Sequence, residues 1–236
     1  MKIVVVGASR GLGKSLSAML VEGGHQVVEG HRVILGGETN QTQVDCDNRV
    51  VKEGGRIPLQ MDVTNEKQMQ EAAEKIKNAM ETIDVVVHVA GVLLPSDRTD
   101  TLMTEPIADI EEQFHVNALG LLISFRSLYP IIKKGGRFIA VTSEGGSFAL
   151  EGELFPAYGI SKTAANKIVQ VLRKTVTDID IVAVHPGRMN TEMGKATAQI
   201  ETIEAARGFV QIIEGNRVWN TKKDWFIDYQ GQSMKL

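Results

Sequence analysis

The first fifteen residues, MKIVVVGASRGLGKS, constrain the fold of this chain more than any other stretch. Residues 3–6 form an apolar, mostly β-branched run without alternation, which is typical of a parallel strand buried on both faces. Gly7, Gly11 and Gly13 follow, and residues 14–21 have helical apolar spacing. Such a strand, turn and helix start present backbone N–H groups at the positive end of the helix dipole, where a phosphate binds. The pattern therefore predicts a nucleotide site.

The glycine spacing is G-x-x-x-G-x-G, which is a longer turn than the usual dinucleotide fingerprint G-x-G-x-x-G. Ala8, Ser9 and Arg10 lie between the first two glycines. A glycine-rich turn that joins a strand to a helix without binding a ligand is the alternative explanation.

Composition excludes several classes of protein. The chain has 236 residues, a formal net charge of −3 and no long block of like charge, so we expect one large α/β domain over residues 1–236 and no nucleic-acid partner. The single cysteine, Cys46, excludes an internal disulfide framework and a cysteine-rich metal site, and we expect a free thiol and no metal. No segment approaches the roughly 20 apolar residues of a membrane span, so we expect a cytoplasmic protein without membrane contact.

Predicted strands alternate with predicted helices along the rest of the chain, which favours a doubly wound parallel sheet. Ligands of such sheets lie beyond the carboxyl ends of the strands, so the strand-ending residues Gly7, Asp62, Gly91, Ser143 and Pro186 are candidates. Residues 33–55 have no helical period, and we expect a loop there. The predicted strands are 25–30, 57–61, 83–91, 137–142, 179–185 and 225–231, and the predicted helices are 65–80, one long helix over 107–134, 157–177 and 202–213.

Tyr158 and Lys162 lie four residues apart near the start of a predicted helix, so their Cβ atoms lie about 6 Å apart on one face. A phenol that works as a general acid/base at neutral pH needs its pKa lowered by about 3 units, or roughly 4 kcal/mol. An ammonium group about 4 Å away in an intermediate dielectric supplies about that much. The pair thus predicts a tyrosine acid/base with a lysine partner, and a solvated helix face is the alternative.

Two further polar residues accompany this pair. Ser143 ends a predicted strand and can donate a hydrogen bond to a carbonyl oxygen. Asn117 lies within a predicted helix beside Val116 and Ala118. An asparagine inside a helix lowers helix propensity and usually either faces water or meets a buried polar requirement, and the apolar neighbours favour the second explanation.

These motifs, in this order, resemble the short-chain dehydrogenases/reductases of the compact, single-domain kind. The resemblance covers essentially the whole chain and implies a Rossmann-like, doubly wound, seven-stranded parallel sheet with helices on both faces. It also implies an oxidoreductase that transfers hydride between a nicotinamide cofactor and a small carbonyl or alcohol substrate. The matching motifs are Gly7-x-x-x-Gly11-x-Gly13, Asp62-Val63, Ala90-Gly91, Asn117, Ser143, Tyr158-x-x-x-Lys162, and Pro186-Gly187 followed by Thr191.

The resemblance assigns the catalytic roles. Tyr158 would be the acid/base, Ser143 would orient the substrate carbonyl, Lys162 would bind the nicotinamide ribose and lower the tyrosine pKa, and Asn117 would hold a water of the proton relay. Asp62 and Val63 would contact the adenine. The predicted cofactor-binding residues are Gly7, Ser9, Arg10, Gly11, Leu12, Gly13, Arg32, Asp62, Val63, Ala90, Gly91, Tyr158, Lys162, Pro186, Gly187, Met189 and Thr191.

Two features qualify the resemblance. The family's usual Asn-Asn-Ala-Gly is replaced by a sequence that starts with His88, which we interpret as a buried histidine with satisfied hydrogen bonds rather than a ligand. The segment after the Pro-Gly motif, residues 193–201, is short. It is similar to that of the C-factor and sniffer carbonyl reductases, and it predicts a small lid and an open substrate site.

We expect NADP(H) to be preferred over NAD(H), and NAD(H) is the alternative cofactor. An NAD enzyme of this fold places an acidic residue at the end of the second strand, but Glu29 comes too early. Arg32 and Arg10 could instead bind a 2′-phosphate from two sides, and solvated surface arginines are the alternative. Glu38 or Asp45 could also reach the ribose.

Other functions fit the sequence less well. A dinucleotide-sensing regulatory protein would not need the intact Ser143, Tyr158 and Lys162 set. A sugar-nucleotide epimerase or dehydratase needs a C-terminal substrate domain that the roughly fifty residues after Pro186 cannot supply. Two long apolar helices, over 107–134 and 157–177, lead us to expect a homodimer or homotetramer.

Overall fold

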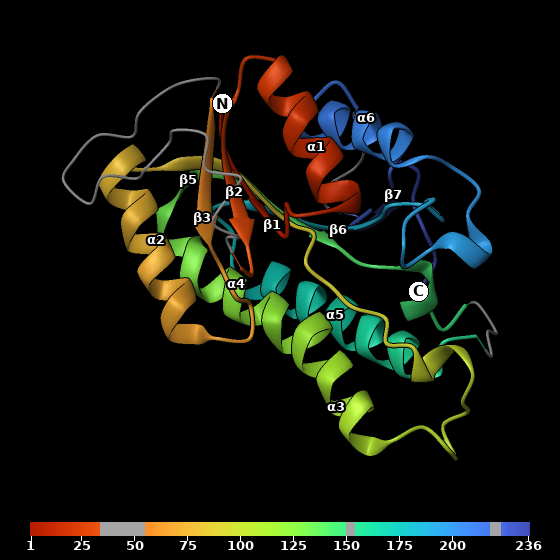
Figure 1. The fold of residues 1–236 in the computed structure, drawn as a ribbon. Helices are drawn as coiled ribbons and strands as arrows, with labels where there is room; N and C mark the ends of the chain where they lie inside the picture. The colour runs from red at the N-terminus through yellow and green to blue at the C-terminus, as the bar shows by residue number, and fades with distance from the viewer. Residues whose placement is uncertain (34–54, 150–153, 218–222) are drawn as a thin grey trace.

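The computed structural model describes residues 1–33, 55–149, 154–217 and 223–236. A seven-stranded, all-parallel sheet runs through the molecule in the order β3-β2-β1-β4-β5-β6-β7 (Figure 1). The strands are β1 (Lys2–Val6), β2 (Gln26–His31), β3 (Arg56–Gln60), β4 (Ile83–His88), β5 (Ile132–Val141), β6 (Asp180–His185) and β7 (Phe226–Asp228). The helices are α1 (Gly11–Glu22), α2 (Glu66–Met80), α3 (Ile107–Phe114), α4 (Gly120–Leu128), α5 (Pro156–Thr175) and α6 (Thr202–Ile213).

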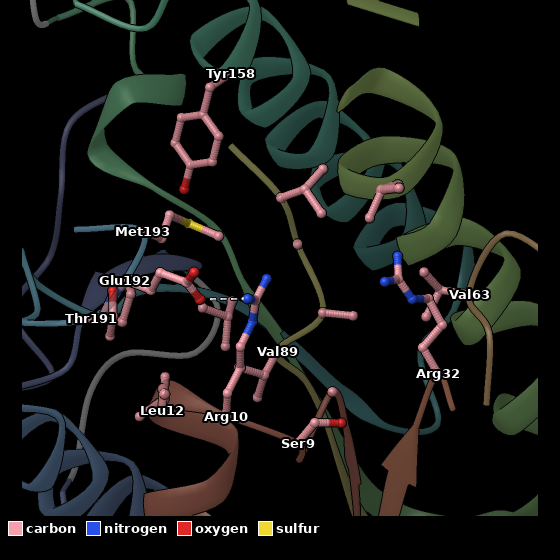
Figure 2. A pocket seen from close by; sticks show the side chains of 18 of the residues that line it. Ser9, Arg10, Leu12, Arg32, Val63, Val89, Tyr158, Thr191, Glu192 and Met193 are labelled. Atoms are coloured by element: carbon pink, nitrogen blue, oxygen red, sulfur yellow. Dashed lines mark hydrogen bonds and ion pairs between the residues drawn. The ribbon is translucent and has the colours of Figure 1, made fainter. Parts of the chain in front are cut away.

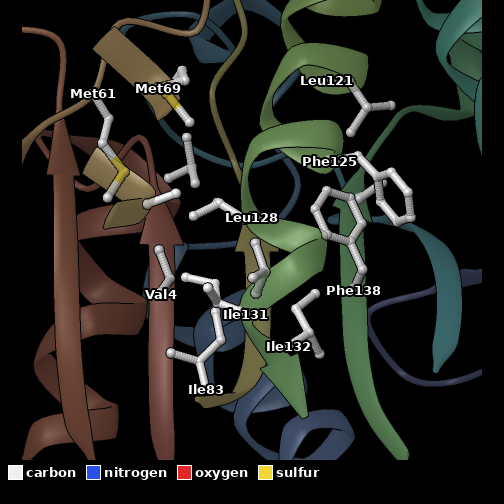
Figure 3. Packing of buried hydrophobic residues seen from close by; sticks show 14 of the residues in the cluster. Val4, Met61, Met69, Ile83, Leu121, Phe125, Leu128, Ile131, Ile132 and Phe138 are labelled. Atoms are coloured by element: carbon white, nitrogen blue, oxygen red, sulfur yellow. The ribbon is translucent and has the colours of Figure 1, made fainter. Parts of the chain in front are cut away.

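Each face of the sheet is covered by its own helices. Side chains alternate across β1, so Val4 and Val6 pack with α2, α4 and α5, whereas Ile3 and Val5 pack with α1 and α6. Figure 3 shows the first of these clusters, where Phe138 of β5 meets Phe125 of α4. Their ring centroids are 5.0 Å apart in an edge-to-face arrangement. The predicted doubly wound sheet is therefore confirmed.

The predicted long helix over 107–134 is helical from Ile107 to Ile131, but it contains a π turn and its predicted end is wrong. A π-helical turn at His115–Leu119 separates α3 from α4, a 3₁₀ turn follows at Tyr129–Ile131, and β5 already begins at Ile132 rather than at the predicted residue 137. Ile132 pairs with Ile83 of β4, because the neighbouring strand offers backbone hydrogen bonds that helical periodicity cannot reveal. The π turn matters for the site, since it contains Asn117.

Two predictions fall outside the described residues. The loop expected at 33–55 lies there except for its first and last residues, and so do Cys46 and the candidate ribose ligands Glu38 and Asp45. In the part of the chain that is described, no helix is long and apolar enough to span a membrane.

Candidate functional site

A cavity of about 1150 Å³ lies at the carboxyl ends of the central strands. It begins at the glycine turn after β1 and reaches the start of α5, as expected where the strand order reverses between β1 and β4. The cavity is slightly larger than the usual range for small-molecule sites. The predicted cofactor-binding residues that line it are Gly7, Ser9, Arg10, Gly11, Leu12, Arg32, Asp62, Val63, Ala90, Gly91, Tyr158, Lys162, Pro186, Met189 and Thr191.

Gly13 and Gly187 were predicted to bind cofactor but are not among the lining residues. A Cβ atom on Gly13 would lie 2.0 Å from the carbonyl oxygen of Gly7, so this glycine permits close packing of α1 against the turn. Gly187 has a φ of +81°, and a Cβ there would lie 2.6 Å from Cδ1 of Ile200. Both glycines shape the backbone around the cavity.

The glycine turn fits an anionic ligand. Arg10 occupies the N-cap position of α1 in an extended conformation, and its side chain makes no capping hydrogen bond. The first turn of α1 contains no acidic residue. The amide groups at this helix start therefore lack a side-chain cap among the described residues, and they open onto the cavity beside Gly11 and Leu12. A pyrophosphate suits this donor set.

The two arginines predicted to hold a 2′-phosphate do not converge. Nη1 of Arg10 lies 2.8 Å from Oε2 of Glu192, which belongs to the segment after β6. Figure 2 shows Arg10 extended toward Glu192 while Arg32 lies on the opposite side of the cavity, near Val63. The prediction that Arg10 approaches the same group as Arg32 is therefore not met in this conformation, because Glu192 offers a carboxylate that the sequence pattern did not reveal.

Asp62 closes the turn after β3. Its Oδ1 atom accepts hydrogen bonds from the backbone N–H and the hydroxyl of Thr64, at 2.9 and 2.7 Å. The neighbouring Val63 is buried and packs against Gly120, where a Cβ would lie 2.8 Å from Cγ2 of Val63. Both residues line the cavity on the side of Arg32, as a role beside an adenosine group requires.

Tyr158 and Lys162 lie side by side at the other end of the cavity. The Nζ atom of Lys162 is 5.5 Å from the centroid of the Tyr158 ring and donates a hydrogen bond to the carbonyl oxygen of Val141 at 3.1 Å. Burial raises the pKa of Tyr158 to about 12, against a smaller lowering by a hydrogen bond from Ser143. Burial lowers the pKa of Lys162 to about 8. The lowered tyrosine pKa that the sequence predicted is thus not found, because the ammonium lies over the ring and desolvation dominates.

Ser143 ends β5 and begins a short 3₁₀ turn, Glu144–Gly146. Its Oγ atom accepts a hydrogen bond from the N–H of Gly145 at 3.1 Å, which leaves the hydroxyl hydrogen free to point at Tyr158. The sequence-predicted partners Ser143, Tyr158 and Lys162 are therefore brought together.

Asn117 is buried beneath these groups. Its Oδ1 accepts from the N–H of Val92 at 2.8 Å, and its Nδ2 donates to the carbonyl oxygen of Val92 at 2.8 Å and to Oγ of Ser161 at 2.9 Å. These hydrogen bonds meet the predicted buried polar requirement, because they join the π turn to the segment after β4 and to α5. A Cβ on Gly91 would lie 3.0 Å from Oδ1 of Asn117 and 3.4 Å from Nζ of Lys162, so glycine permits their close approach. The water-holding role stays a prediction.

His88 is buried, as predicted, but its hydrogen bonds are not satisfied. Among the described residues neither ring nitrogen has a partner with normal hydrogen-bond geometry. Burial and the charge of Lys162 lower the pKa of His88 to about 3, against a weaker contribution from the backbone of Ala90. His88 is therefore neutral at physiological pH. No cluster of histidine, cysteine or acidic residues that could hold a metal occurs in the described ranges.

Sequence reasoning missed several lining residues. Glu192 and Met193 follow Thr191 directly, and their place after the Pro-Gly motif was an available signal. Three charged or titratable residues at the α3 end of the cavity had no sequence signal, because helical periodicity does not show which polar side chains of a helix face a cavity. They are Glu111, Glu112 and His115.

Comparison with known proteins gives consistent relatives. The family profile described as short chain dehydrogenase matches residues 1–202. An NADPH-dependent aldehyde reductase-like chloroplastic protein of Arabidopsis thaliana is 29% identical over 229 residues, which cover 91% of this chain and 83% of that protein.

Two solved structures share the fold over its full length. A short-chain dehydrogenase/reductase from Burkholderia multivorans with bound NADP has a TM-score of 0.81 at 23% identity, and the carbonyl reductase Sniffer of D. melanogaster has a TM-score of 0.84 at 19% identity. Each match covers 100% of this chain and 99% of the other.

Proposed function

Because the chain belongs to the short-chain dehydrogenase family, we propose that it is a single-domain, NADP(H)-preferring reductase of small carbonyl compounds that uses Tyr158 as its general acid. The observation that carries this proposal is that Tyr158 and Lys162, with Ser143 beside Tyr158, line one end of a cavity whose other end is a helix start without a side-chain cap among the described residues. Ser143 itself is not among the lining residues. One end suits proton transfer, and the other suits a pyrophosphate.

The residues present fit a nicotinamide dinucleotide. The amides at the start of α1, behind Gly7 and Gly11, would hold the pyrophosphate, while Asp62 and Val63 would face the adenine. Lys162 would bind the nicotinamide ribose, and Thr191 the nicotinamide end. When bound, the cofactor would supply the hydride.

Arg32 supports the preference for NADP(H). It lines the cavity at the end of β2, where an arginine can form charge-assisted hydrogen bonds to a 2′-phosphate. The NADPH dependence named for the Arabidopsis protein and the NADP bound in the Burkholderia structure agree with this choice.

Tyr158 would give its proton to the substrate oxygen as the carbonyl carbon is reduced. Figure 2 shows its hydroxyl directed into the cavity near Met193. Ser143 would hold the same oxygen by a hydrogen bond. A phenol whose pKa is raised by burial holds its proton at neutral pH, and this is the protonation state that proton donation to a carbonyl oxygen requires. The apolar lining beside it, Val92, Met189 and Met193, suits an uncharged carbonyl compound such as an aldehyde, ketone or quinone.

Replacing Tyr158 by phenylalanine tests this function. We expect Y158F to lose at least about 100-fold in kcat and to keep its affinity for NADPH, because proton transfer is removed and cofactor contacts remain. The matched control is Y129F, since Tyr129 does not line the cavity and its hydroxyl donates a hydrogen bond to Asp178. The assay follows NADPH fluorescence against a panel of aldehydes, ketones and quinones.

The rival function is a regulatory protein that senses the dinucleotide without turnover. Wild-type protein that binds NADPH but reduces no member of the panel would favour the rival. A Y158F variant that keeps more than a few per cent of wild-type kcat would remove Tyr158 from its role.

A further inference from the structure

Helix α5, which carries Tyr158, begins without a cap of its own. Phe155 precedes the helix with a φ of +56°, and its side chain has no hydrogen-bond acceptor. Pro156 follows and has no N–H group. The first free amides are those of Ala157 and Tyr158, which in most helices bond a Ser, Thr, Asp or Asn side chain at the N-cap.

Asp97 supplies this cap from another part of the chain. It lies in the segment between β4 and α3 and is 1% exposed. Its Oδ1 accepts from the N–H of Ala157 at 3.0 Å, and its Oδ2 accepts from the N–H of Tyr158 at 2.8 Å. A carboxylate is also the favourable charge at a helix N-terminus. Both oxygens of one buried side chain therefore hold the backbone that carries the tyrosine.

Glu105 packs against Asp97 and is itself buried. Its Oε1 accepts from Oγ of Ser96 and Nε2 of Gln113, each at 3.3 Å, while its Oε2 has no partner among the described residues other than the neighbouring Asp97. Burial and then the charge of Asp97 raise the pKa of Glu105, with a smaller effect from Asp109. A protonated Glu105 can donate a hydrogen bond to Asp97.

Arg98 connects the same segment to the lid. Its Nη2 donates to the carbonyl oxygen of Met193 at 2.6 Å, and its guanidinium lies over the ring of Phe155, 5.6 Å from the centroid. Met193 lines the cavity, and Figure 2 shows its side chain beside the hydroxyl end of Tyr158. The adjacent residues Asp97 and Arg98 thus contact the start of α5 and the opposite wall of the cavity, respectively.

We propose that Asp97, supported by Glu105, is a positioning residue that places the Tyr158 hydroxyl by capping α5. Arg98 links Met193, at the start of the predicted lid segment, to Phe155 at the start of α5. The proposal rests on the proposed role of Tyr158 as general acid. Asp97 is not among the residues that line the cavity, and its hydrogen bonds to α5 go to the backbone of Ala157 and Tyr158.

Three substitutions separate positioning from simple stability. In D97A, we expect kcat to fall at least tenfold while the Kd for NADPH changes less than about twofold, because the start of α5 loses its cap. E105Q keeps a hydrogen-bond donor toward Asp97 and should retain wild-type kcat. N65A is the matched control, because Asn65 caps α2 by accepting from the N–H of Gln68 at 3.0 Å. It should lower the melting temperature, by less than D97A because Asn65 is exposed and accepts one hydrogen bond, and leave kcat unchanged.

A phenol titration supplies a readout that does not need turnover. Phenolate absorbance at about 295 nm is measured at about pH 11 for each variant and for the same variant carrying Y158F, and the difference is the signal of Tyr158. Circular dichroism verifies that each protein is folded. Burial raises the pKa of Tyr158, so we expect the wild-type phenol to stay mostly protonated there, whereas D97A should show more phenolate because a loosened helix start hydrates the ring. N65A should match the wild type.

The outcomes distinguish the two proposals. If D97A loses stability as N65A does but keeps wild-type kcat and phenol titration, Asp97 is only a structural cap and the inference fails. If D97A does not fold, D97N, which retains one acceptor oxygen, takes its place with an intermediate effect expected. If the wild type reduces no carbonyl compound, the proposed function fails, and the titration still decides whether Asp97 positions Tyr158.

Discussion

Replacing Lys162 by methionine should make the protein more stable and less able to bind cofactor. Burial lowers the pKa of Lys162 from 10.5 to about 8, which corresponds to about 3 kcal/mol of destabilisation while the ammonium is charged. Methionine has similar length and no charge, but its introduction removes the hydrogen bond to Val141, worth about 1 kcal/mol. The net gain in unfolding free energy at pH 7 is therefore about 2 kcal/mol.

The pH dependence of wild-type stability shows where the stability advantage of K162M should appear and where it should vanish. Because the folded-state pKa is depressed, the unfolded state binds more protons between pH 8 and 10.5, so wild-type stability rises with pH through this window. The neighbouring groups do not titrate there, since the pKa of His88 is about 3 and that of Tyr158 about 12. The advantage of K162M should be full below pH 8 and disappear by about pH 10.5.

Thermal unfolding of the protein without cofactor measures this difference. A gain of about 2 kcal/mol raises Tm by about 4–8 °C for a chain of this size. The matched control is K167M, because Lys167 is an exposed lysine of the same helix. NADPH titration should show weaker binding for K162M than for Y158F. A K162M protein that is less stable than wild type at pH 7, or a gain that persists at pH 10.5, would refute the reasoning.

Two further predictions concern the cofactor and the assembly. R32A should lower the ratio of kcat/KM for NADPH to that for NADH by at least about tenfold. R10A should lower this ratio less, because Arg10 pairs with Glu192. R10A should therefore cost more in an E192Q background than in the wild-type background, and equal losses in the two backgrounds would contradict this reasoning. We also expect a homodimer or homotetramer through α5, where Ile160 and Val171 are 45% and 50% exposed, so that I160D with V171D yields a monomer by light scattering. A monomeric wild type at micromolar concentration would end this expectation.

Local sequence patterns determined much of this molecule. Unbroken β-branched runs predicted the buried strands, and helical periodicity predicted α6 with the bounds that it has, because both signals depend on residues close in the chain. The spacing of Tyr158 and Lys162 likewise placed them on one helix face, since an i, i+4 pair needs no tertiary information.

Contacts between distant segments decided the rest. The π turn between α3 and α4 contains Asn117, whose side chain bonds Val92 and Ser161, and the apolar pattern of the helix carries no trace of those partners. The cap on Tyr158 comes from a residue 61 positions earlier in the chain. The pKa of that tyrosine rises rather than falls because desolvation depends on how completely the surrounding elements bury it, which only the packed structure determines.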